Sequence, residues 1–256
     1  MNSQYITIKT PAPGIVMLTL DNPARYNTLS QDMISALHTA LSSVSTDENT
    51  RVIILNGAGK GFCAGHDLTE INENRSEEFY RTLVGDCCTL MQLIQSIPQP
   101  VIAQIHGAAS AAGCQLVAAC DLAYAAQDAL FSTPGVLIGL FCTTPMVALS
   151  RSIHPKQALE MLLTGDFISA EKATSISLIN DKAPADTLEK VVMDTAIKIA
   201  AKPPYIIGMG KKSFYKQAEM NTEDAYRFTT ERMVENLMAQ EARDGIASFL
   251  TRKKSA

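Results

Sequence analysis

The chain has 256 residues, of which 46% are hydrophobic and 19% charged, and its formal net charge is −4. This length suits one large domain, or one domain with an appendage, and it is sufficient to bury a sizeable core. A weakly acidic chain without a basic stripe is not typical of a nucleic-acid binder. The apolar runs are too short to span a bilayer, so neither nucleic acid nor membrane is an expected partner.

The ends of the chain and its cysteines bear on location. The opening residues, MNSQYITIKT, show neither the charged-then-apolar layout of a signal peptide nor the Arg-rich pattern of a transit peptide. The final TRKKSA is not a peroxisomal tripeptide. The 6 cysteines form no C-x-x-C pair, which favours reduced thiols, and the 4 histidines lack metal-ligand spacing. These features predict a cytoplasmic protein without a metal site.

Strand and helix patterns alternate through the first half of the chain. Ser30 is a candidate N-cap for an amphipathic helix that runs through Leu41, and a polar helix is expected to end near Ile97, before two prolines. This alternation favours an α/β fold with some parallel sheet. The predicted strands are Tyr5–Lys9, Ile15–Leu20, Val52–Leu55, Val101–Ile105, Asp121–Ala125 and Ala129–Phe131.

From Pro145 onward the apolar residues recur mainly at helical spacing, and no repeat or obvious linker divides the chain. A helical region of this kind either covers the core or mediates assembly. We therefore predict a core over residues 1–195 and a helical assembly region over 196–256. The predicted helices are Lys156–Thr164, Ser169–Ser177, Thr187–Ala201 and Thr222–Gln240.

The glycine-rich loop GAGKGFCAGHDL follows a predicted buried strand, as a phosphate-binding loop would. Its spacing does not match, because Lys60 is followed by Gly61, and a dinucleotide fingerprint would require glycine where Phe62 stands. The spacing alone favours a flexible strand-to-helix loop. The loop reaches His66 at an expected helix start, where backbone N–H groups lack partners.

A second turn of this kind lies in AASAAGCQLVAACD, residues 108–121. Its small residues lead from a strand into a helix predicted over Cys114–Cys120, so the first N–H groups are exposed at the positive end of the helix dipole. The small residues can equally reflect tight packing of a buried helix. If both turns offer an N–H group, they form a two-donor oxyanion hole.

Four stretches resemble the crotonase superfamily, that is, the enoyl-CoA hydratases and isomerases. The resemblance extends from Tyr5 to about Arg252. Two further stretches, FSTPGVLIGLFCTTP and GKKSFYKQ, are similar to the branch of enoyl-CoA-hydratase-domain-containing protein 3. The four family stretches are DNPARYNTLS at 21–30, GKGFCAGHDLTEI at 59–71, IPQPVIAQIHGAASAAGCQLVAACDLAYA at 97–125 and LEMLLTGDFISAEKA at 159–173.

The resemblance implies a spiral of ββα units, followed by a helical trimerisation region, in a homotrimer or a dimer of trimers. It implies an acyl-CoA thioester as substrate or ligand, with no tightly bound cofactor. The backbone N–H groups of His66 and Ala112 would bind the thioester carbonyl. The positions implied for CoA binding are Ala24, Arg25, Ala64, Asp67, Leu68, Phe249 and Lys253.

The sequence departs from the family pattern at both acid–base positions. Where the family's hydratases carry glutamates, this chain has Gln115 and Gly135. Glutamine exchanges no proton at neutral pH, and glycine has no side chain to do so. Gln115 either satisfies a buried hydrogen bond or holds a water or a polar substrate group beside the thioester. His66 is the best alternative candidate for proton transfer.

Three hypotheses follow for function. The first is a hydratase/isomerase-like protein that polarises a thioester carbonyl but hydrates weakly or not at all. The second is chemistry that needs only enolate stabilisation, such as decarboxylation of a malonyl-type thioester. The third is an acyl-CoA-binding or assembly scaffold without catalysis.

Overall fold

The computed structural model describes residues 4–253. Its strands are β1 (Ile6–Ala12), β2 (Ile15–Leu20), β3 (Val52–Gly57), β4 (Val101–Ile105), β5 (Ala108–Ser110), β6 (Leu122–Ala126), β7 (Leu130–Ser132), β8 (Ile168–Ser169) and β9 (Asp181–Ala183). Its α-helices are α1 (Gln31–Ser45), α2 (Leu68–Glu73), α3 (Glu77–Ser96), α4 (Ala112–Ala119), α5 (Thr143–Ser152), α6 (Pro155–Thr164), α7 (Ala170–Ser175), α8 (Leu188–Ala200), α9 (Pro204–Ala218), α10 (Thr222–Met238) and α11 (Gln240–Lys253). Short 3₁₀ helices occupy Pro23–Arg25 and Pro134–Ile138.

The main sheet has the strand order β1-β2-β3-β4-β6-β9. The β1–β2 pair is antiparallel, and every other neighbouring pair is parallel. The predicted α/β fold with a parallel sheet is confirmed. Since β2, β3 and β4 run in the same direction, the loops that follow them meet at one edge of the sheet, where α/β proteins place their ligands.

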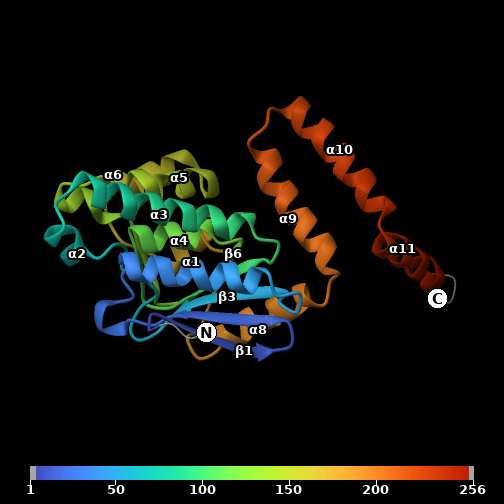
Figure 1. The fold of residues 1–256 in the computed structure, drawn as a ribbon, viewed down its shortest axis with the longest axis horizontal. Helices are drawn as coiled ribbons and strands as arrows, with labels where there is room; N and C mark the ends of the chain where they lie inside the picture. Colours follow the sequence, from blue (N-terminus) through green and yellow to red (C-terminus); the bar gives the residue numbers. More distant parts are fainter. Residues whose placement is uncertain (1–3, 254–256) are drawn as a thin grey trace.

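Both faces of the sheet are covered, and strand β3 shows how its sequence achieves this. Its side chains alternate between two hydrophobic clusters, with Ile53 and Leu55 in one and Val52 and Ile54 in the other. Helices α1, α3 and α4 cover the first face and α8 the second (Figure 1). A strand buried on both faces reads as a continuous apolar run, which is the pattern that predicted it.

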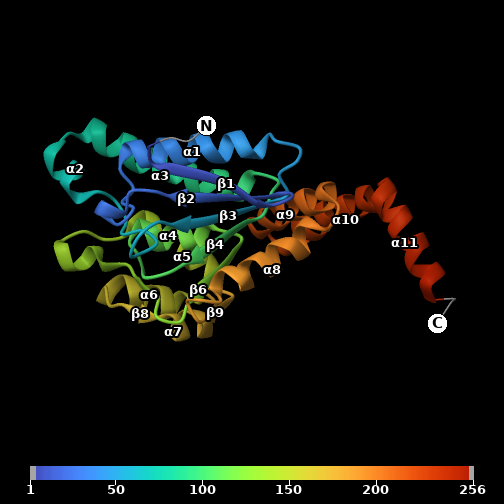
Figure 2. The same ribbon diagram turned by 90° about the horizontal axis from the view of Figure 1, so that it is seen from below.

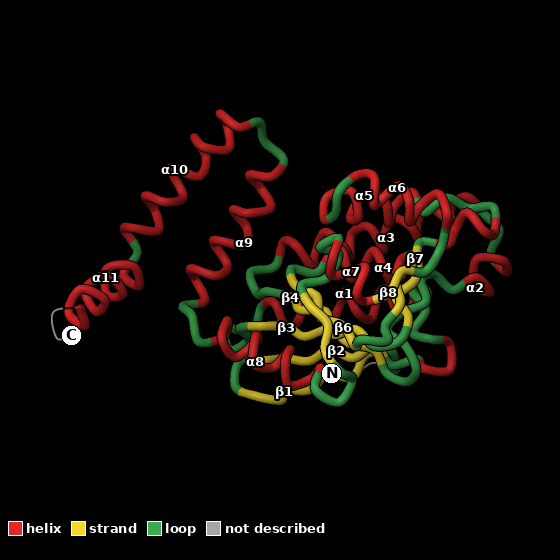
Figure 3. The backbone as a smooth tube through the Cα atoms, turned by 180° about the vertical axis from the view of Figure 1, so that it is seen from behind, coloured by secondary structure: helices red, strands yellow, loops and turns green. Residues whose placement is uncertain are grey.

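A second, three-stranded sheet has the order β5-β7-β8, with β5 parallel to β7 and β7 antiparallel to β8. Its strands β7 and β8 lie side by side in Figure 3. A bridge between Cys63 and Ala109 joins the glycine-rich loop to β5. The pairing of Ser110 with Ser132 brings the loop after β7 beside the turn that begins α4. This small sheet therefore gathers three loops that are distant in sequence.

The C-terminal helices α9, α10 and α11 leave the body as an arm (Figures 1 and 2). Helix α10 contains no buried residue, and Gly208 is the buried residue of α9. The predicted division at residues 195 and 196 falls inside α8, where Leu188, Val192 and Ala196 are buried against the sheet. The region that leaves the body thus begins with α9.

A buried ion pair fastens the base of this arm to the core. The Lys211 ammonium lies 2.6 Å from the Asp121 carboxylate and donates to the carbonyls of Ile94 and Gln99 at 2.7 and 2.8 Å. The Tyr215 hydroxyl donates to the other Asp121 oxygen at 2.9 Å. Every oxygen of the carboxylate thus has a partner, which a buried charge requires.

The sequence did not predict α5, α9 and α11 as separate helices, and the expected polar helix divides into α2 and α3. The break falls where Asn74 ends α2 and the Ser76 side chain caps α3. Helix α9 carries two glycines, which lower helix propensity. Gly208 is needed there, because a Cβ at that position would lie 2.9 Å from Cβ of Pro98.

Candidate functional site

Asn27 joins the segment after β2 to the glycine-rich loop after β3. It is fully buried and adopts a left-handed backbone conformation, with φ +54°. Its side-chain nitrogen donates to the carbonyls of Ala58, Gly61 and Phe62 at 2.9, 2.9 and 3.1 Å, and its oxygen accepts from the Asn22 amide at 2.9 Å. The sequence shows Asn27 only as part of a family motif, and its role in holding the loop emerges from the fold.

The turn into α4 is strained. Ala111 has φ +50° and ψ −117°, a region that residues other than glycine rarely adopt. Its amide donates to the Ser132 carbonyl at 2.9 Å, and the Ser110 amide donates to the Cys63 carbonyl at 2.9 Å. Hydrogen bonds on both sides therefore hold the turn in a conformation that an isolated chain would avoid.

Two glycines allow the glycine-rich loop after β3 (the first loop) and the turn into α4 (the second loop) to touch backbone to backbone. A Cβ on Gly65 would lie 3.2 Å from the Ala112 nitrogen and 2.9 Å from Cβ of Ala111. A Cβ on Gly113 would lie only 2.2 Å from the Cys63 carbonyl oxygen. Both positions require glycine because no side chain fits between the loops.

Two backbone amides on these adjoining loops lack acceptors. The first hydrogen bond within α4 runs from the Gln115 amide to the Ala111 carbonyl at 3.0 Å, so the Ala112 amide has no acceptor in its own helix. Among the hydrogen bonds of the described residues, none uses the His66 amide as donor. Unpaired N–H groups, one of them at a helix N-terminus, can stabilise an oxygen that gains negative charge.

The His66 ring is held in one orientation. Its Nδ1 lies 3.1 Å from the Leu29 carbonyl, which can only accept, so Nδ1 carries the proton. Nε2 is buried and has no partner among the described residues. Burial lowers the pKa of the ring below its ordinary value, so the imidazole is neutral at pH 7. The ring therefore presents an acceptor and carries no positive charge.

This burial predicts a pH-dependent stability. Below the ordinary pKa of 6.5, unfolded His66 takes up a proton before the folded form does, so the free energy of unfolding falls as the pH drops. We expect His66→Asn to shrink the stability difference between about pH 7.5 and about pH 5.5 in urea titrations. A difference identical to that of the parent protein would show that the ring protonates equally well in both states.

Arg25 and Asp67 form a two-point ion pair between the segment after β2 and the first loop. Nη1 and Nη2 of the arginine each lie 3.1 Å from a carboxylate oxygen. Asp67 also caps α2 by accepting from the amides of Thr69 and Glu70 at 3.0 and 3.3 Å. The Arg25 side chain remains 49% exposed, so a positioned guanidinium faces solvent here.

The positions of the two absent glutamates differ in character. Gln115 lies in the first turn of α4, is 3% exposed, and its Oε1 is buried without a partner among the described residues. Gly135 lies in the 3₁₀ helix after β7, where a Cβ would meet the Cys142 sulfur at 3.0 Å and the Leu140 carbonyl oxygen at 3.1 Å. The Cys142 thiol thus leaves little room for the Cβ atom of any side chain at position 135.

Glutamates are absent from the sequence on both sides of Gln115 and Gly135. The chain contains no glutamate between Glu78 and Glu160. Burial raises the pKa of the Cys142 thiol, which therefore stays protonated and gives no strong nucleophile. One neutral polar group here, the fully buried Thr133 hydroxyl, was not predicted from the sequence.

A family model described as Enoyl-CoA hydratase/isomerase matches residues 11–256. The chain belongs to the enoyl-CoA hydratase/isomerase family. Enoyl-CoA hydratase domain-containing protein 3, mitochondrial, of Xenopus laevis is 40% identical over 249 residues, covering 97% of this chain and 85% of that protein. Its human counterpart is 40% identical over 241 residues, covering 94% and 80%.

Solved structures confirm the crotonase fold predicted from the resemblance. An enoyl-CoA hydratase of Mycobacterium smegmatis matches with a TM-score of 0.95 at 43% identity, covering 97% of this chain and 96% of that one. Human enoyl-CoA hydratase domain-containing protein 3 matches with a TM-score of 0.94 at 39% identity, covering 97% and 98%. The predicted similarity to that branch of the family is also confirmed.

The comparisons contradict the predicted cytoplasmic location. The curated relatives from Xenopus laevis, mouse and human all carry mitochondrial names and point to mitochondria. The prediction relied on the absence of a leader pattern in the first ten residues, and this absence does not decide location. Within the part of the chain that the structure describes, no helix combines the length and apolarity needed to cross a bilayer.

The residues predicted to bind CoA fall into two groups. The first group lies on two adjoining segments and consists of Ala24, Arg25, Ala64, Asp67 and Leu68. A hydrogen bond from the Ala64 amide to the Tyr26 carbonyl and the Arg25–Asp67 ion pair hold these segments together. Phe249 is 65% exposed on α11, at the far end of the arm (Figure 1). The Lys253 side chain lies outside the described residues.

The fold does not bring Phe249 to the other five positions within one chain. Helix α10 buries no side chain against the core of its own chain, and it carries α11 away from the body (Figure 2). Sequence similarity places a residue in a family motif but does not say which subunit's site the motif reaches.

Proposed function

We propose that this protein binds an acyl- or enoyl-CoA thioester and polarises its carbonyl between the backbone N–H groups of His66 and Ala112. The observation that carries the proposal is the contact between the two loops, in which Gly65 lies against the Ala112 nitrogen and neither amide has an acceptor among residues 4–253. Each donor of this kind contributes about 10²–10³ in rate to a reaction that builds negative charge on oxygen.

The exposed guanidinium of Arg25 supports CoA as the carrier. Its two contacts with Asp67 fix the planar group, and a fixed guanidinium suits phosphate oxygens. In this proposal Ala24, Ala64 and Leu68 line the same approach, and CoA enters and leaves with the substrate. Phe249 contributes from the arm of another subunit, and Lys253 stays a CoA position that the family resemblance implies.

The reaction is expected to differ from ordinary hydration. Hydration needs one group to activate water and one to protonate carbon, and such groups contribute about 10²–10⁴ each. Gln115 and Gly135 supply neither. Crotonyl-CoA hydration should therefore be weak or absent, and turnover at ordinary enzyme rates would show that another group replaces the glutamates.

The neutral groups around Gln115 favour decarboxylation of a malonyl-type thioester as a second candidate. The departing CO₂ leaves its electron pair on the α-carbon, the two N–H donors stabilise the resulting enolate oxygen, and water supplies the proton that the α-carbon then takes up to give the acyl thioester. Release of CO₂ from malonyl-CoA that Ala112→Pro diminishes would support this reaction. No turnover of any thioester would leave the third candidate, an acyl-CoA-binding scaffold.

Replacing Ala112 with proline tests the carbonyl contact itself. The position is the first of α4, where helices accept proline, and the change replaces the N–H with a ring carbon. We expect the thioester to lose its advantage over free CoA by about fivefold in calorimetric titrations, because a hydrogen bond contributes roughly 1 kcal/mol. Ala112→Gly keeps the N–H and serves as control. If Ala112→Pro folds and binds thioesters as the parent protein does, the contact is absent.

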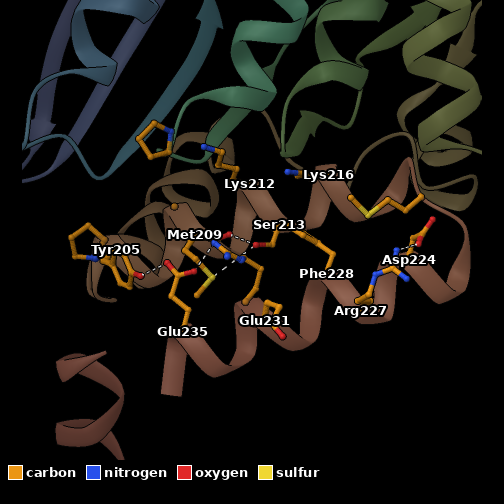
Figure 4. Close-up of a pocket in the computed structure, with 15 residues that line it drawn as sticks. Tyr205, Met209, Lys212, Ser213, Lys216, Asp224, Arg227, Phe228, Glu231 and Glu235 are labelled. Atoms are coloured by element: carbon orange, nitrogen blue, oxygen red, sulfur yellow. Dashed lines mark hydrogen bonds and ion pairs between the residues drawn. The ribbon is translucent and has the colours of Figure 1, made fainter. Parts of the chain in front are cut away.

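We also propose assembly as a homotrimer or a dimer of trimers through the C-terminal arm. A groove of about 890 Å³ separates α9 from α10 (Figure 4). The helices are linked across it by the Tyr205–Glu235 hydrogen bond at 2.9 Å and by Lys216 over the Phe228 ring. Helix α10 also exposes large apolar side chains, among them Met233, Leu237 and Met238. Light scattering should give three or six times 27.6 kDa; a monomer would contradict assembly.

A further inference from the structure

The sheet face that α8 covers changes from apolar to polar near the carboxyl ends of its strands. Ile54 on β3 and Ile102 on β4 belong to the hydrophobic cluster on this face and are paired in register. Because side chains alternate along a strand, the residues two positions further on, Asn56 and Gln104, lie on the same face and side by side. Thr19 of β2 is paired with Asn56 and extends this polar row.

The two amides of this row carry oxygens without partners. Asn56 Oδ1 and Gln104 Oε1 are both buried, and neither has a hydrogen-bond partner among the described residues. The Asn56 nitrogen donates to the Met17 sulfur at 3.5 Å, and sulfur is a weak acceptor. Buried polar atoms nearly always have hydrogen-bond partners, so two unpaired oxygens on neighbouring strands indicate a partner from outside the described chain.

A cavity of about 480 Å³ is lined by both amides. This volume lies within the range of small-molecule sites. The cavity lies on the sheet face that α8 covers, whereas α4, which begins with Ala112, covers the opposite face (Figure 1). It is therefore separate from the proposed thioester site.

Side chains of opposite charge also line this cavity. Lys9 lies on the edge strand β1, and Glu189 lies in the first turn of α8. Neither forms an ion pair with another of the described residues. In the strand order β1-β2-β3-β4, Lys9 lies at one end of the polar row and Gln104 at the other. The cavity thus offers a cation at its β1 end and unpaired acceptors toward β4.

The chemistry of these groups selects the ligand. The two amide oxygens and the Glu189 carboxylate can only accept hydrogen bonds, whereas the Lys9 ammonium can only donate. Terminal amide torsions are soft, so both amides can turn their oxygens toward a bound donor. A simple anion would leave these oxygens unpaired. A lone metal ion would fill little of the volume, and Lys9 would repel it.

We propose that this cavity binds a free amino acid as its zwitterion. The ammonium group of the ligand donates to Asn56 Oδ1, Gln104 Oε1 and the Glu189 carboxylate, and its carboxylate accepts from Lys9. Charge-assisted hydrogen bonds of this kind are the stronger ones in proteins, so the ligand satisfies at once the two oxygens and the two charges that the chain leaves unpaired.

Thermal unfolding with each of the common L-amino acids at about 10 mM identifies the ligand, because a ligand of the folded state raises the unfolding midpoint. Calorimetry then compares the best amino acid with the amine that lacks its carboxylate and the acid that lacks its ammonium. We expect each truncated compound to bind at least about tenfold more weakly. The proposal is overturned if no amino acid raises the midpoint, or if either truncated compound binds as tightly as the amino acid.

Near-isosteric variants assign the binding to these residues. Asn56→Leu and Gln104→Met should each weaken amino-acid binding at least about fivefold. Lys9→Met should weaken binding of the amino acid but not of the amine that lacks the carboxylate. Gln157→Met is the matched control, because Gln157 Oε1 is also buried without a partner among the described residues but lines a different cavity. Parent affinity in Asn56→Leu and Gln104→Met would overturn the proposal.

Thermal unfolding of the ligand-free variants separates this role from a structural one. Removing an unpaired buried oxygen breaks no hydrogen bond, so Gln104→Met should leave the unfolding midpoint unchanged or raised. A marked fall in the midpoint would show that the amide has a structural partner within the chain, and it would overturn the proposal.

Discussion

Gly113→Ala is expected to abolish thioester binding and to lower the free energy of unfolding by about 3 kcal/mol. The added methyl would lie 2.2 Å from the carbonyl oxygen of Cys63 and 2.8 Å from its carbonyl carbon. Both atoms belong to the backbone of the first loop, so no side-chain rotation relieves the clash. The loops must separate, and the two amides separate with them.

A glycine in open space provides the control. Apart from its chain neighbours and the backbone of its own helix, no atom lies within 4 Å of a Cβ built on Gly85, in helix α3. Gly85→Ala should therefore stabilise the protein by about 0.5–1 kcal/mol through helix propensity. Urea titration measures the stability of both variants, and calorimetry measures their binding of butyryl-CoA. If Gly113→Ala binds the thioester with parent affinity, close loop contact is not needed for the site.

Lys211→Met is expected to lower the free energy of unfolding by about 3–5 kcal/mol. The change leaves the Asp121 carboxylate, whose side chain is 13% exposed, without its cation. It also removes the donor to the Ile94 and Gln99 carbonyls. Since this pair fastens α9 to the core, we expect the arm to loosen, which hydrogen exchange of α9 amides would detect.

An exposed ion pair offers the matched comparison. Lys190 lies 2.6 Å from Asp194 on α8, and both side chains are largely open to solvent. Lys190→Met should change the unfolding free energy by no more than about 0.5 kcal/mol. Equal small effects from both lysine variants would contradict the role of Lys211 as the anchor of the arm.

The sequence predicted elements whose patterns arise from burial. Strand β3 reads as an apolar run because both of its faces are covered, and the helix from Gln31 was located by its Ser30 cap. Strands β8 and β9 have two and three residues and are too short to show the alternation of apolar and polar residues that identifies a strand. Helix α9 was missed because Gly208 lowers its helix propensity, and the glycine is there because it packs closely against Pro98.

The site was predictable where local turn chemistry determines it. Small residues before α4 indicated exposed amides, and the structure places the Ala112 amide against Gly65. Thr133 was not found, because an unpaired hydroxyl is defined by the absence of neighbours, which only the fold reveals. The CoA-binding role of Phe249 stays a prediction, since a motif does not specify the direction in which the arm leaves the body.

The vibrational frequency of the bound thioester carbonyl tests the central claim most directly. An acyl-CoA labelled with ¹³C at the carbonyl is bound to the protein, and isotope-edited infrared difference spectra locate its C=O stretch. Two converging N–H donors should lower that frequency below its value for the free ligand in water, and Ala112→Pro should recover part of the shift. A bound thioester whose carbonyl frequency equals that of the free ligand would contradict the account.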